Sequence, residues 1–300
     1  MFIVTHRKLF YIFSGVLVCA SIVFLAVWGL QFGIDFTGGS LLEVRFTDVR
    51  PEIPILQERL NNVKFGSAVL QPSEESNLLI RTRDITETEH QIILQALAGD
   101  TEPAVVLEEL RFDSIGPVIG NELRRKSFTA LLLVLLMILI FITWSFRKVS
   151  RPVASWKYGL VALIALAHDV IIPVGLFSLL GQFYHVEVGT LFVTALLTIL
   201  GFSVHDTIIV FDRIRENITR IGSTIPFEEV VGKSLSEVMG RSIATSFTLF
   251  VVLFLLFLFG ESSTTFFSLT LLVGVVAGTY SSIFLASPLI VTWQQFSSRK

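Results

Sequence analysis

The sequence predicts an α-helical polytopic membrane protein with six transmembrane helices and one small extracytoplasmic α+β domain. Hydrophobic residues make up 52% of the 300-residue chain and charged residues only 16%, which is far more apolar than a soluble domain. Six apolar segments are each long enough to cross a bilayer, which takes about 20 residues of helix. In addition, 16 of the 25 acidic residues lie between Gln31 and Lys126, in one long polar segment.

The apolar segments divide the chain into three parts. They cover residues 9–30, 128–146, 158–180, 188–211, 243–260 and 266–292. We therefore expect a cytoplasmic N-terminus with the first helix at 1–30, an extracytoplasmic domain at 31–126, and five further helices at 127–300. The first segment follows Arg7 and Lys8, as in a signal peptide. It is longer than the apolar region of a signal peptide and lacks a small-x-small cleavage pattern, so we expect an uncleaved helix.

Basic residues indicate the orientation of the helices. They gather in four places: Arg7 and Lys8; Arg147, Lys148, Arg151 and Lys157; five residues between Arg213 and Arg241; and Arg299 with Lys300. The short loops at 181–188 and 260–265 have no basic residue. Because Lys and Arg favour the cytoplasmic side, both termini are expected in the cytoplasm. The tryptophans lie at expected helix ends, where such rings prefer the headgroup level: Trp28, Trp144, Trp156 and Trp293.

The polar segment 31–126 has the pattern of a ferredoxin-like domain. We expect strands at 41–46, 63–70, 78–82 and 105–112, helices at 54–60 and 86–99, and a turn at 71–77. The second helix begins with a capping box, Thr86-Glu87-Thr88-Glu89. The resulting order, β-α-β-β-α-β, is that of a split βαβ fold. The domain has one histidine, His90, which we expect to be solvated, and no cysteine, so a coupling module is favoured over a catalytic one.

Two aspartates within the apolar segments are the strongest indication of function. The third segment contains His168-Asp169 and the fourth contains His205-Asp206. A charged carboxylate in hydrocarbon costs about 3 kcal/mol or more, so both side chains should face protein or a watery cavity. Each pair is interpretable as a structural hydrogen bond or as a proton site that titrates near neutral pH. For Asp206 we favour the proton site, and for Asp169 both interpretations stay open.

Arg241 is a candidate partner for Asp206. It is expected to open the fifth helix, which runs antiparallel to the fourth. Asp206 lies six residues before the expected end of the fourth helix at Asp212, about 9 Å of helix rise. A long arginine side chain can reach that far, although a basic residue at a helix start often only sets the topology. The segment after Arg241 is rich in hydroxyls and includes Thr245.

Four segments resemble signatures of the SecF family of protein-export membrane subunits. They are Gly33-Ile34-Asp35-Phe36-Thr37-Gly38-Gly39, residues 115–123, residues 205–217 beginning His205-Asp206-Thr207, and residues 241–246 beginning Arg241-Ser242. The segments occur in the family's order and span most of the chain. His205 departs from the asparagine that many members carry, and Ala244 is a smaller departure.

The resemblance implies one half of a complex of the resistance-nodulation-division (RND) type in the bacterial inner membrane. A SecD-like subunit would be the partner, and the pair would use the proton-motive force to move preproteins through the SecYEG channel. Asp206 would transfer the proton, with Arg241 as its basic partner and Asp169 as an accessory. His205, His168 and Thr245 would have accessory roles, and Gly33, Asp35, Gly38 and Gly39 would form a hinge. We expect no cofactor, metal or nucleic acid, with membrane lipid as the surroundings.

Other functions fit the sequence less well. An intramembrane aspartyl protease would use Asp169 and Asp206, but neither lies in a Gly-x-Gly-Asp context, and no His-Glu-x-x-His motif indicates a metalloprotease. An RND-type efflux half-transporter would need larger extracytoplasmic domains than 31–126. Because neither protease motif is present, we do not expect an enzyme. A small-residue stripe near the C-terminus fits either a partner helix or internal packing: Gly274, Gly278, Ser281 and Ser282.

Overall fold

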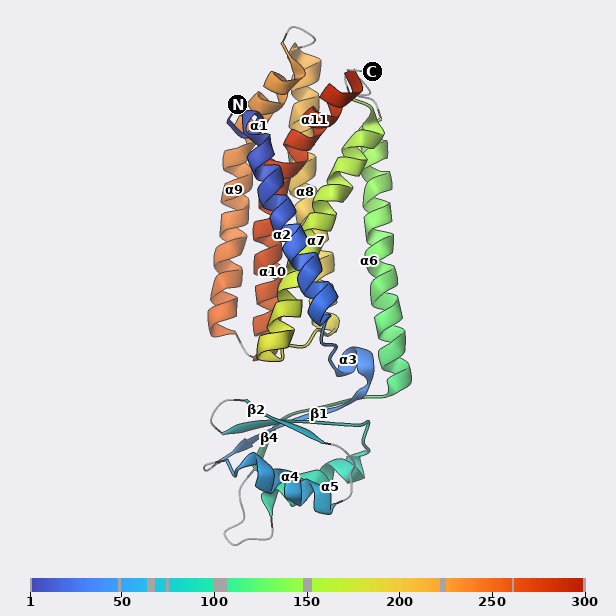
Figure 1. The fold of residues 1–300 in the computed structure, drawn as a ribbon, viewed down its shortest axis with the longest axis vertical. Helices are drawn as coiled ribbons and strands as arrows, with labels where there is room; N and C mark the ends of the chain where they lie inside the picture. Colours follow the sequence, from blue (N-terminus) through green and yellow to red (C-terminus); the bar gives the residue numbers. More distant parts are fainter. Residues whose placement is uncertain are drawn as a thin grey trace. The chain divides into compact units, whose positions relative to one another are not determined.

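The computed structural model describes residues 2–47, 50–63, 68–73, 76–99, 107–147, 153–221, 225–260 and 262–298. The chain forms two compact units (Figure 1). One is a helical bundle built from Met1–Gln31 and Phe128–Lys300, and the other is an α+β domain at Phe32–Ser127. Several residues of the sequence argument lie outside the described part: 64–67, 74–75, 105–106, Lys148, Arg151, Arg299 and Lys300.

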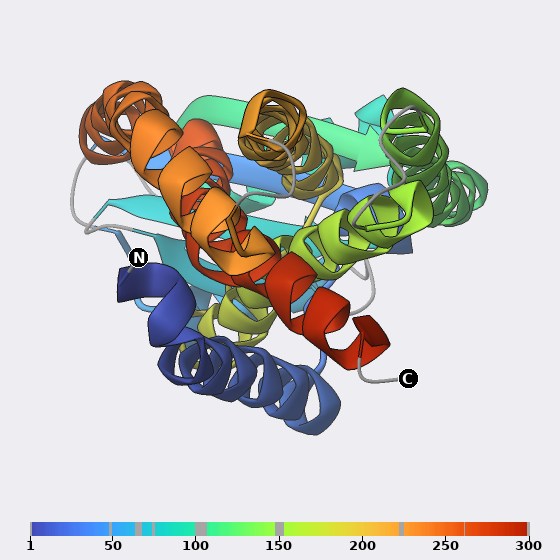
Figure 2. The ribbon, with the colours of Figure 1, turned by 90° about the horizontal axis from the view of Figure 1, so that it is seen from above.

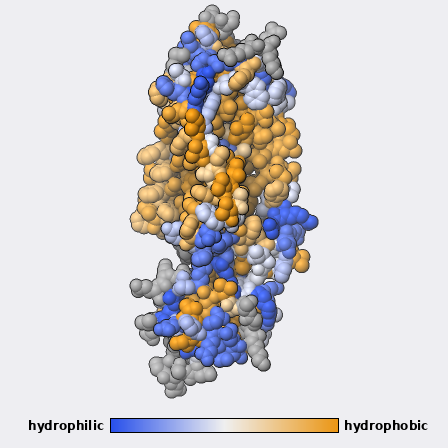
Figure 3. Space-filling model, in the orientation of Figure 1, coloured by the Kyte–Doolittle hydropathy of each residue, from blue (hydrophilic) through white to orange (hydrophobic). Residues whose placement is uncertain are grey.

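Within the described residues, six helices are long and apolar enough to cross a membrane, as predicted. Five are α2 Arg7–Trp28, α6 Pro117–Ser145, α7 Ser155–Tyr184, α8 Thr190–Ile221 and α9 Phe227–Phe259. The sixth span joins α10 Ser262–Tyr280, a π-helical turn η1 Ser281–Ala286, and α11 Ser287–Ser298. A short helix, α1 Phe2–Thr5, precedes α2. Figure 3 shows hydrophobic side chains over most of the visible face of the bundle.

Two helices continue well past their predicted ends. The structure ends α8 at Ile221 instead of 211 and begins α9 at Phe227 instead of 243. The added turns pack on each other, since Arg213 Nε lies 2.6 Å from Glu237 Oε2 and Val231 is fully buried. Hydropathy detects only the apolar part of a helix, and polar residues do not end it. The prediction that Arg241 opens the fifth helix is therefore wrong, because Arg241 lies inside α9.

Burial separates central helices from peripheral ones. The apolar stretches of α7, α8 and the sixth span are 50%, 44% and 61% buried, whereas those of α2, α6 and α9 are 11%, 6% and 17% buried. Viewed from above, α2 and α6 lie at the rim of the bundle (Figure 2). Polar side chains on α7, α8 and α10 are therefore the ones that protein surrounds.

The α+β domain has the predicted element order. It contains β1 Gly39–Phe46, α4 Ile53–Asn62, β2 Val69–Ser73, β3 Asn77–Thr82, α5 Glu87–Ala98 and β4 Leu107–Ile115. The strands pair antiparallel in the order β2-β3-β1-β4. Alternate residues of β1, such as Leu42 and Val44, face a core closed by Leu56 of α4 and Ile93 of α5. The capping box is confirmed, because Thr86 and Glu89 accept each other's backbone N–H.

Two local predictions in this domain are wrong. The strand expected at 63–70 is β2 at Val69–Ser73, so part of the predicted turn is strand. Pro72 is tolerated there because β2 is an edge strand. His90 is not solvated but only 3% exposed. Its ring stacks on Phe112 with centroids 3.9 Å apart, and its nitrogens lie near the carboxylates of Glu87 and Glu109.

Candidate functional site

Asp169 on α7 is completely buried and has three hydrogen-bonding neighbours. Ser203 Oγ of α8 and Ser281 Oγ of η1 donate to the same carboxylate oxygen, Oδ2, at 2.5 and 2.8 Å. His168 Nδ1 lies 2.9 Å from the other oxygen, Oδ1. His168 is itself buried, and its Nε2 has no partner among the described residues. One carboxylate thus ties α7, α8 and η1 together.

Asp206 on α8 is also buried, at 2% exposure, but it is held more loosely. Ser246 Oγ of α9 donates to Asp206 Oδ2 at 3.4 Å, and no second hydrogen bond to this carboxylate is found in the described part of the chain. Thr279 of α10 in turn donates to Ser246 Oγ at 2.7 Å. A long contact of this kind stabilises a charge less than a short one.

Further hydroxyls lie between the two carboxylates. Thr207, next to Asp206, is 2.8 Å from Ser282 Oγ, and Ser282 is the neighbour of Ser281 in η1. A π-helical turn is uncommon and is often found at functional sites. Here it brings two successive serines, both fully buried, toward α7 and α8. Carboxylates and hydroxyls this close together form a group of buried side chains that can accept and exchange protons.

The other predicted site residues on α8 and α9 lie outside this cluster. His205 is exposed on the bundle surface, while the next residue, Asp206, points inward. Arg241 is exposed too, and no ion pair joins it to Asp206 among the described residues. Thr245 is exposed and donates to the Arg241 carbonyl of its own helix at 3.0 Å. The predicted pairing of Asp206 and Arg241 is absent from this conformation.

The small-residue stripe packs within the chain, which decides between its two interpretations. A Cβ added at Gly278 would lie 2.9 Å from Ser203 Cβ, and one added at Gly274 would lie 2.1 Å from Ile199 Cδ1. Both neighbours are on α8. The stripe lets α10 approach α8 closely, so that Ser281 and Ser282 reach the polar cluster.

Sequence reasoning missed Ser203, Ser246 and Thr279. They lie within predicted apolar spans, where serine and threonine are common and bond to their own helix. The sequence contains only a weak indication of these residues. Ser246 lies in the signature-like segment 241–246, and Ser203 lies just before the segment 205–217. Only the rotation of each helix shows that these hydroxyls face a carboxylate.

The glycine-rich segment forms a tight junction. Gly33 and Gly38 flank a short helix, α3 Ile34–Thr37, which carries the half-buried Asp35. Gly38 and Gly39 have φ of 75° and 124°, where other residues are strained. A Cβ at Gly38 would lie 2.7 Å from Pro117 Cα, and one at Gly39 would lie 2.7 Å from the Thr82 carbonyl oxygen. A loose turn does not have contacts this close.

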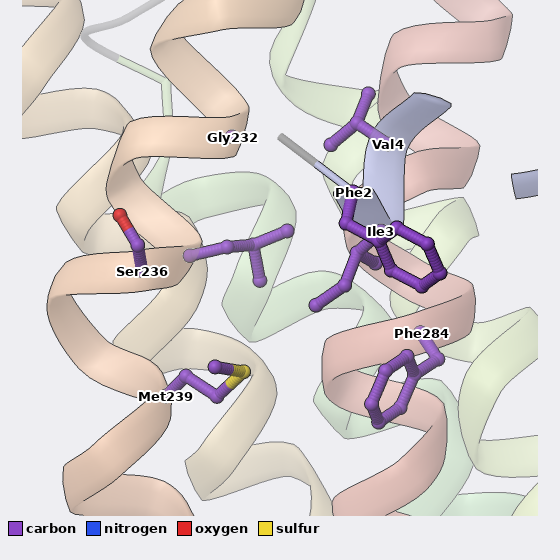
Figure 4. Close-up of a pocket in the computed structure, with 8 residues that line it drawn as sticks. Phe2, Ile3, Val4, Gly232, Ser236, Met239 and Phe284 are labelled. Carbon is purple, nitrogen blue, oxygen red and sulfur yellow. The ribbon is translucent and has the colours of Figure 1, made fainter. Parts of the chain in front are cut away.

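Two apolar cavities open on the bundle. One, of about 450 Å³, lies between α9 and α10, and its lining includes Ser246 and Thr279. The other, of about 330 Å³, lies between Phe2, Ile3 and Val4 on one side and Gly232, Ser236 and Met239 of α9 on the other (Figure 4). The second has no titratable residue in its lining. In the described residues, no group of three His, Cys, Asp or Glu side chains can hold a metal.

The fold and this cluster define a class: a polytopic membrane protein with two carboxylates buried in its central helices. The sequence family described as "Protein export membrane protein SecD/SecF, C-terminal" matches residues 97–296, and "SecD/SecF GG Motif" matches residues 23–48. The chain belongs to the SecD/SecF family. It is a Sec protein-export subunit and a multi-pass protein of the bacterial inner membrane, and efflux is not favoured. Proteins of this family are translocase subunits and not classical enzymes.

Individual relatives agree over almost the whole chain. Protein translocase subunit SecF of Thermobaculum terrenum is 40% identical over 97% of this chain and 93% of its own length. The SecF of Sebaldella termitidis is 38% identical over 97% and 91%. The crystal structure of SecDF from Thermus thermophilus matches with a TM-score of 0.81 at 31% identity. That match covers 97% of this chain but only 38% of the SecDF chain.

Proposed function

We propose that this subunit works with a SecD-like subunit and uses the proton-motive force to promote preprotein translocation through a SecYEG channel. The SecDF matches support the pairing. This chain covers 38% of the Thermus thermophilus SecDF and 35% of the protein translocase subunit SecDF of Brucella abortus, so each of these proteins joins a SecF-like part to a longer remainder. The distribution of Lys and Arg supports cytoplasmic termini. Membrane lipid surrounds the peripheral helices α2, α6 and α9 wherever no partner covers them.

The contrast between the two buried carboxylates carries the assignment of the proton site. Asp169 has two short serine contacts and a histidine, so its environment is fixed and favours a structural or accessory role. Asp206 has a single hydrogen bond of 3.4 Å in the described residues. A buried carboxylate with so little stabilisation of its charge is the better candidate for gaining and losing a proton. We assign proton transfer to Asp206.

Arg241 would meet Asp206 in another conformation. It lies on α9 five residues before Ser246, about 7.5 Å along the helix axis, and α9 is mostly peripheral. A shift of α9 against α8 would exchange the serine contact for an ion pair, giving two packings whose balance depends on the proton. A charge crossing the membrane supplies roughly 2.3 kcal/mol per 100 mV, enough to bias such an equilibrium. Thr245, His205 and His168 would adjust the surroundings of the two carboxylates.

The glycine junction would connect this movement to the α+β domain. Gly33, Asp35, Gly38 and Gly39 would form the hinge, and the close contacts of Gly38 with Pro117 and of Gly39 with Thr82 lie within the α+β unit.

Replacing Asp206 by asparagine tests the proton site. We expect Asp206→Asn to abolish the stimulation of preprotein translocation by a proton gradient in membrane vesicles, while folding and copurification with SecD-like partners persist. Asparagine keeps the shape and removes the titration. Asp212→Asn is the matched control, because Asp212 is exposed on the same helix. Asp169→Asn should be milder, and Arg241→Ala should impair stimulation. A fully gradient-responsive Asp206→Asn protein would refute the assignment.

A further inference from the structure

Two hydroxyl groups, one on α9 and one on α10, link Asp206 of α8 to these two helices through successive hydrogen bonds. Thr279 Oγ1 of α10 lies 2.7 Å from Ser246 Oγ of α9, and Ser246 lies 3.4 Å from Asp206 Oδ2. Thr279 also contacts the Val275 carbonyl of its own helix at 2.8 Å. Its hydroxyl therefore has two acceptors and can turn from one to the other. Ser246 stands in the middle and can both accept and donate.

The position of Ser246 on α9 indicates that these hydrogen bonds connect helices and are not confined to α9. The apolar stretch of α9 is only 17% buried, but Ser246 is 7% exposed, so it lies on the narrow face that meets the rest of the bundle. Its neighbours along the helix, Thr245 and Thr248, are exposed and donate to their own helix at 3.0 and 2.9 Å. Ser246 and Thr279 also line the 450 Å³ cavity between α9 and α10, so the two helices have room to move there.

We propose that Ser246 and Thr279 are positioning residues that form a hydroxyl latch, through which the charge on Asp206 controls the packing of α9 against α8 and α10. The proposal rests on Asp206 being the proton site. An ionised carboxylate can only accept, so Ser246 donates to it and is free to accept from Thr279. At the same separation, a hydroxyl is attracted more strongly to an ionised carboxylate than to a neutral carboxyl, even where the contact is as long as this one. The latch is therefore strongest while Asp206 is ionised.

Protonation weakens the latch. A hydronium ion gives up a proton and leaves as water, so that one of its O–H bonds breaks as a new O–H bond forms on Oδ2 of Asp206. The neutral carboxyl then donates to Ser246 Oγ in place of accepting from it. The Ser246 proton turns to the carbonyl one helical turn earlier, as the Thr245 and Thr248 protons already do. Thr279 keeps its bond to Val275 O. No covalent bond of Ser246 or Thr279 breaks, and α9 becomes easier to displace.

Other titratable groups near α8 must be separated from this effect. On α7 these are His168 and Asp169, which contact each other. On α9 they are Arg241, which is exposed, and Glu237, which pairs with Arg213. Tyr280 lies on α10, and the exposed His205 lies on α8 itself. Asp206→Asn is therefore needed beside every hydroxyl variant, so that an effect through one of these groups is told apart from one through Asp206.

The test measures helix position and not export. In the full chain, Cys19→Ser removes the native cysteine. Val252→Cys on α9 and Val276→Cys on α10, both at exposed positions, carry the spin labels. The labelled chain is reconstituted in nanodiscs with the membrane subunits that copurify, and label distances are measured from pH 5 to pH 9. We expect a pH-dependent shift in the label distance that is lost in Asp206→Asn, Ser246→Ala and Thr279→Val. Ser246→Thr and Thr279→Ser, which keep the hydroxyl, should retain it, as should the control Thr248→Val, because the Thr248 hydroxyl bonds to the Ala244 carbonyl of its own helix.

Each outcome decides one part of the argument. If the shift is lost in Asp206→Asn but kept in Ser246→Ala and Thr279→Val, the latch is wrong and the proton site stands. If Asp206→Asn keeps the shift, the proton site itself fails. No shift in the parent chain, or loss of the shift in Thr248→Val as well, would also overturn the latch. The hydroxyl-retaining variants exclude misfolding as the cause of a loss.

Discussion

Ser281, the first residue of the π-helical turn, donates a 2.8 Å hydrogen bond to Asp169 of α7, and Ser203 of α8 donates to the same oxygen. The bond spans 112 positions in the sequence. It joins the sixth membrane span to the third, and both of its residues, Ser281 and Asp169, are fully buried. Asp169 is therefore a point at which three helices are held together.

Removing one of these serines should destabilise the bundle. We expect Ser281→Ala to lower the free energy of unfolding by about 1–3 kcal/mol, because a buried carboxylate loses one of its hydrogen-bond donors. Thermal unfolding in detergent would show this as a lower midpoint. Ser236→Ala is the control, since Ser236 is exposed and, within the described part of the chain, its hydroxyl bonds only to the Lys233 carbonyl of its own helix. Equal midpoints for the two variants would show that the Asp169 contact contributes nothing to stability.

The close approach of α10 to α8 at Gly278 should not tolerate a methyl group. Gly278→Ala would place Cβ 2.9 Å from Ser203 Cβ, and neither atom can rotate away. We expect a loss of roughly 1–3 kcal/mol in unfolding free energy, as for overpacked cores. Gly201→Ala, on α8 with nothing within 4 Å of the new atom, is the control and should be neutral or slightly stabilising. A Gly278→Ala protein as stable as this control would refute the packing argument.

The glycine junction predicts two separable costs. Gly39→Ala combines an unfavourable φ of 124° with a Cβ 2.7 Å from the Thr82 oxygen, whereas Gly29→Ala has a φ of 68° and open space. We expect Gly29→Ala to cost about 1 kcal/mol from backbone strain and Gly39→Ala to cost clearly more. Hydrogen exchange at β1 and β3 in the full chain measures the second effect. Unchanged protection of β1 in Gly39→Ala would contradict a packed junction.

Glu89 predicts how the α+β domain responds to acid. Two hydrogen bonds lower the pKa of Glu89 from 4.5 to about 2. The larger effect comes from the Arg83 side chain and the smaller one from the Thr86 backbone N–H. A carboxyl with a depressed folded-state pKa stabilises the fold above its ordinary pKa, and the effect disappears as the pH falls from 4.5 toward 2. Glu89→Gln should therefore increase hydrogen exchange at the start of α5 at pH 7 but not at pH 2.

The exposed Glu58 on α4 supplies the control for this experiment. Glu58 has no hydrogen bond or ion pair in the described part of the chain, so Glu58→Gln should leave exchange at α5 unchanged at both pH values. If Glu89→Gln had the same effect at pH 2 as at pH 7, the capping box would act through shape and not through charge.

Local patterns were sufficient for most of the fold. The apolar spans, the capping box at Thr86 and the β-α-β-β-α-β order each depend on neighbouring residues, and the structure contains all of them. Errors occurred where a distant partner decides the outcome. The extension of α9 is stabilised by Arg213 and Glu237 on different helices, and His90 is buried because Phe112 of β4 covers its ring.

The candidate site divides along the same line. The sequence alone determined that Asp169 and Asp206 lie within apolar helices, because the high cost of a charge in hydrocarbon makes any such residue conspicuous. Only the tertiary structure decided which groups meet them. Neighbouring positions on a helix point about 100° apart, so the rotation of α8 about its axis decides that Asp206 is buried while His205 is exposed. That rotation depends on the packing of α8 against α9 and α10, which places Ser246, and not Arg241, beside the carboxylate.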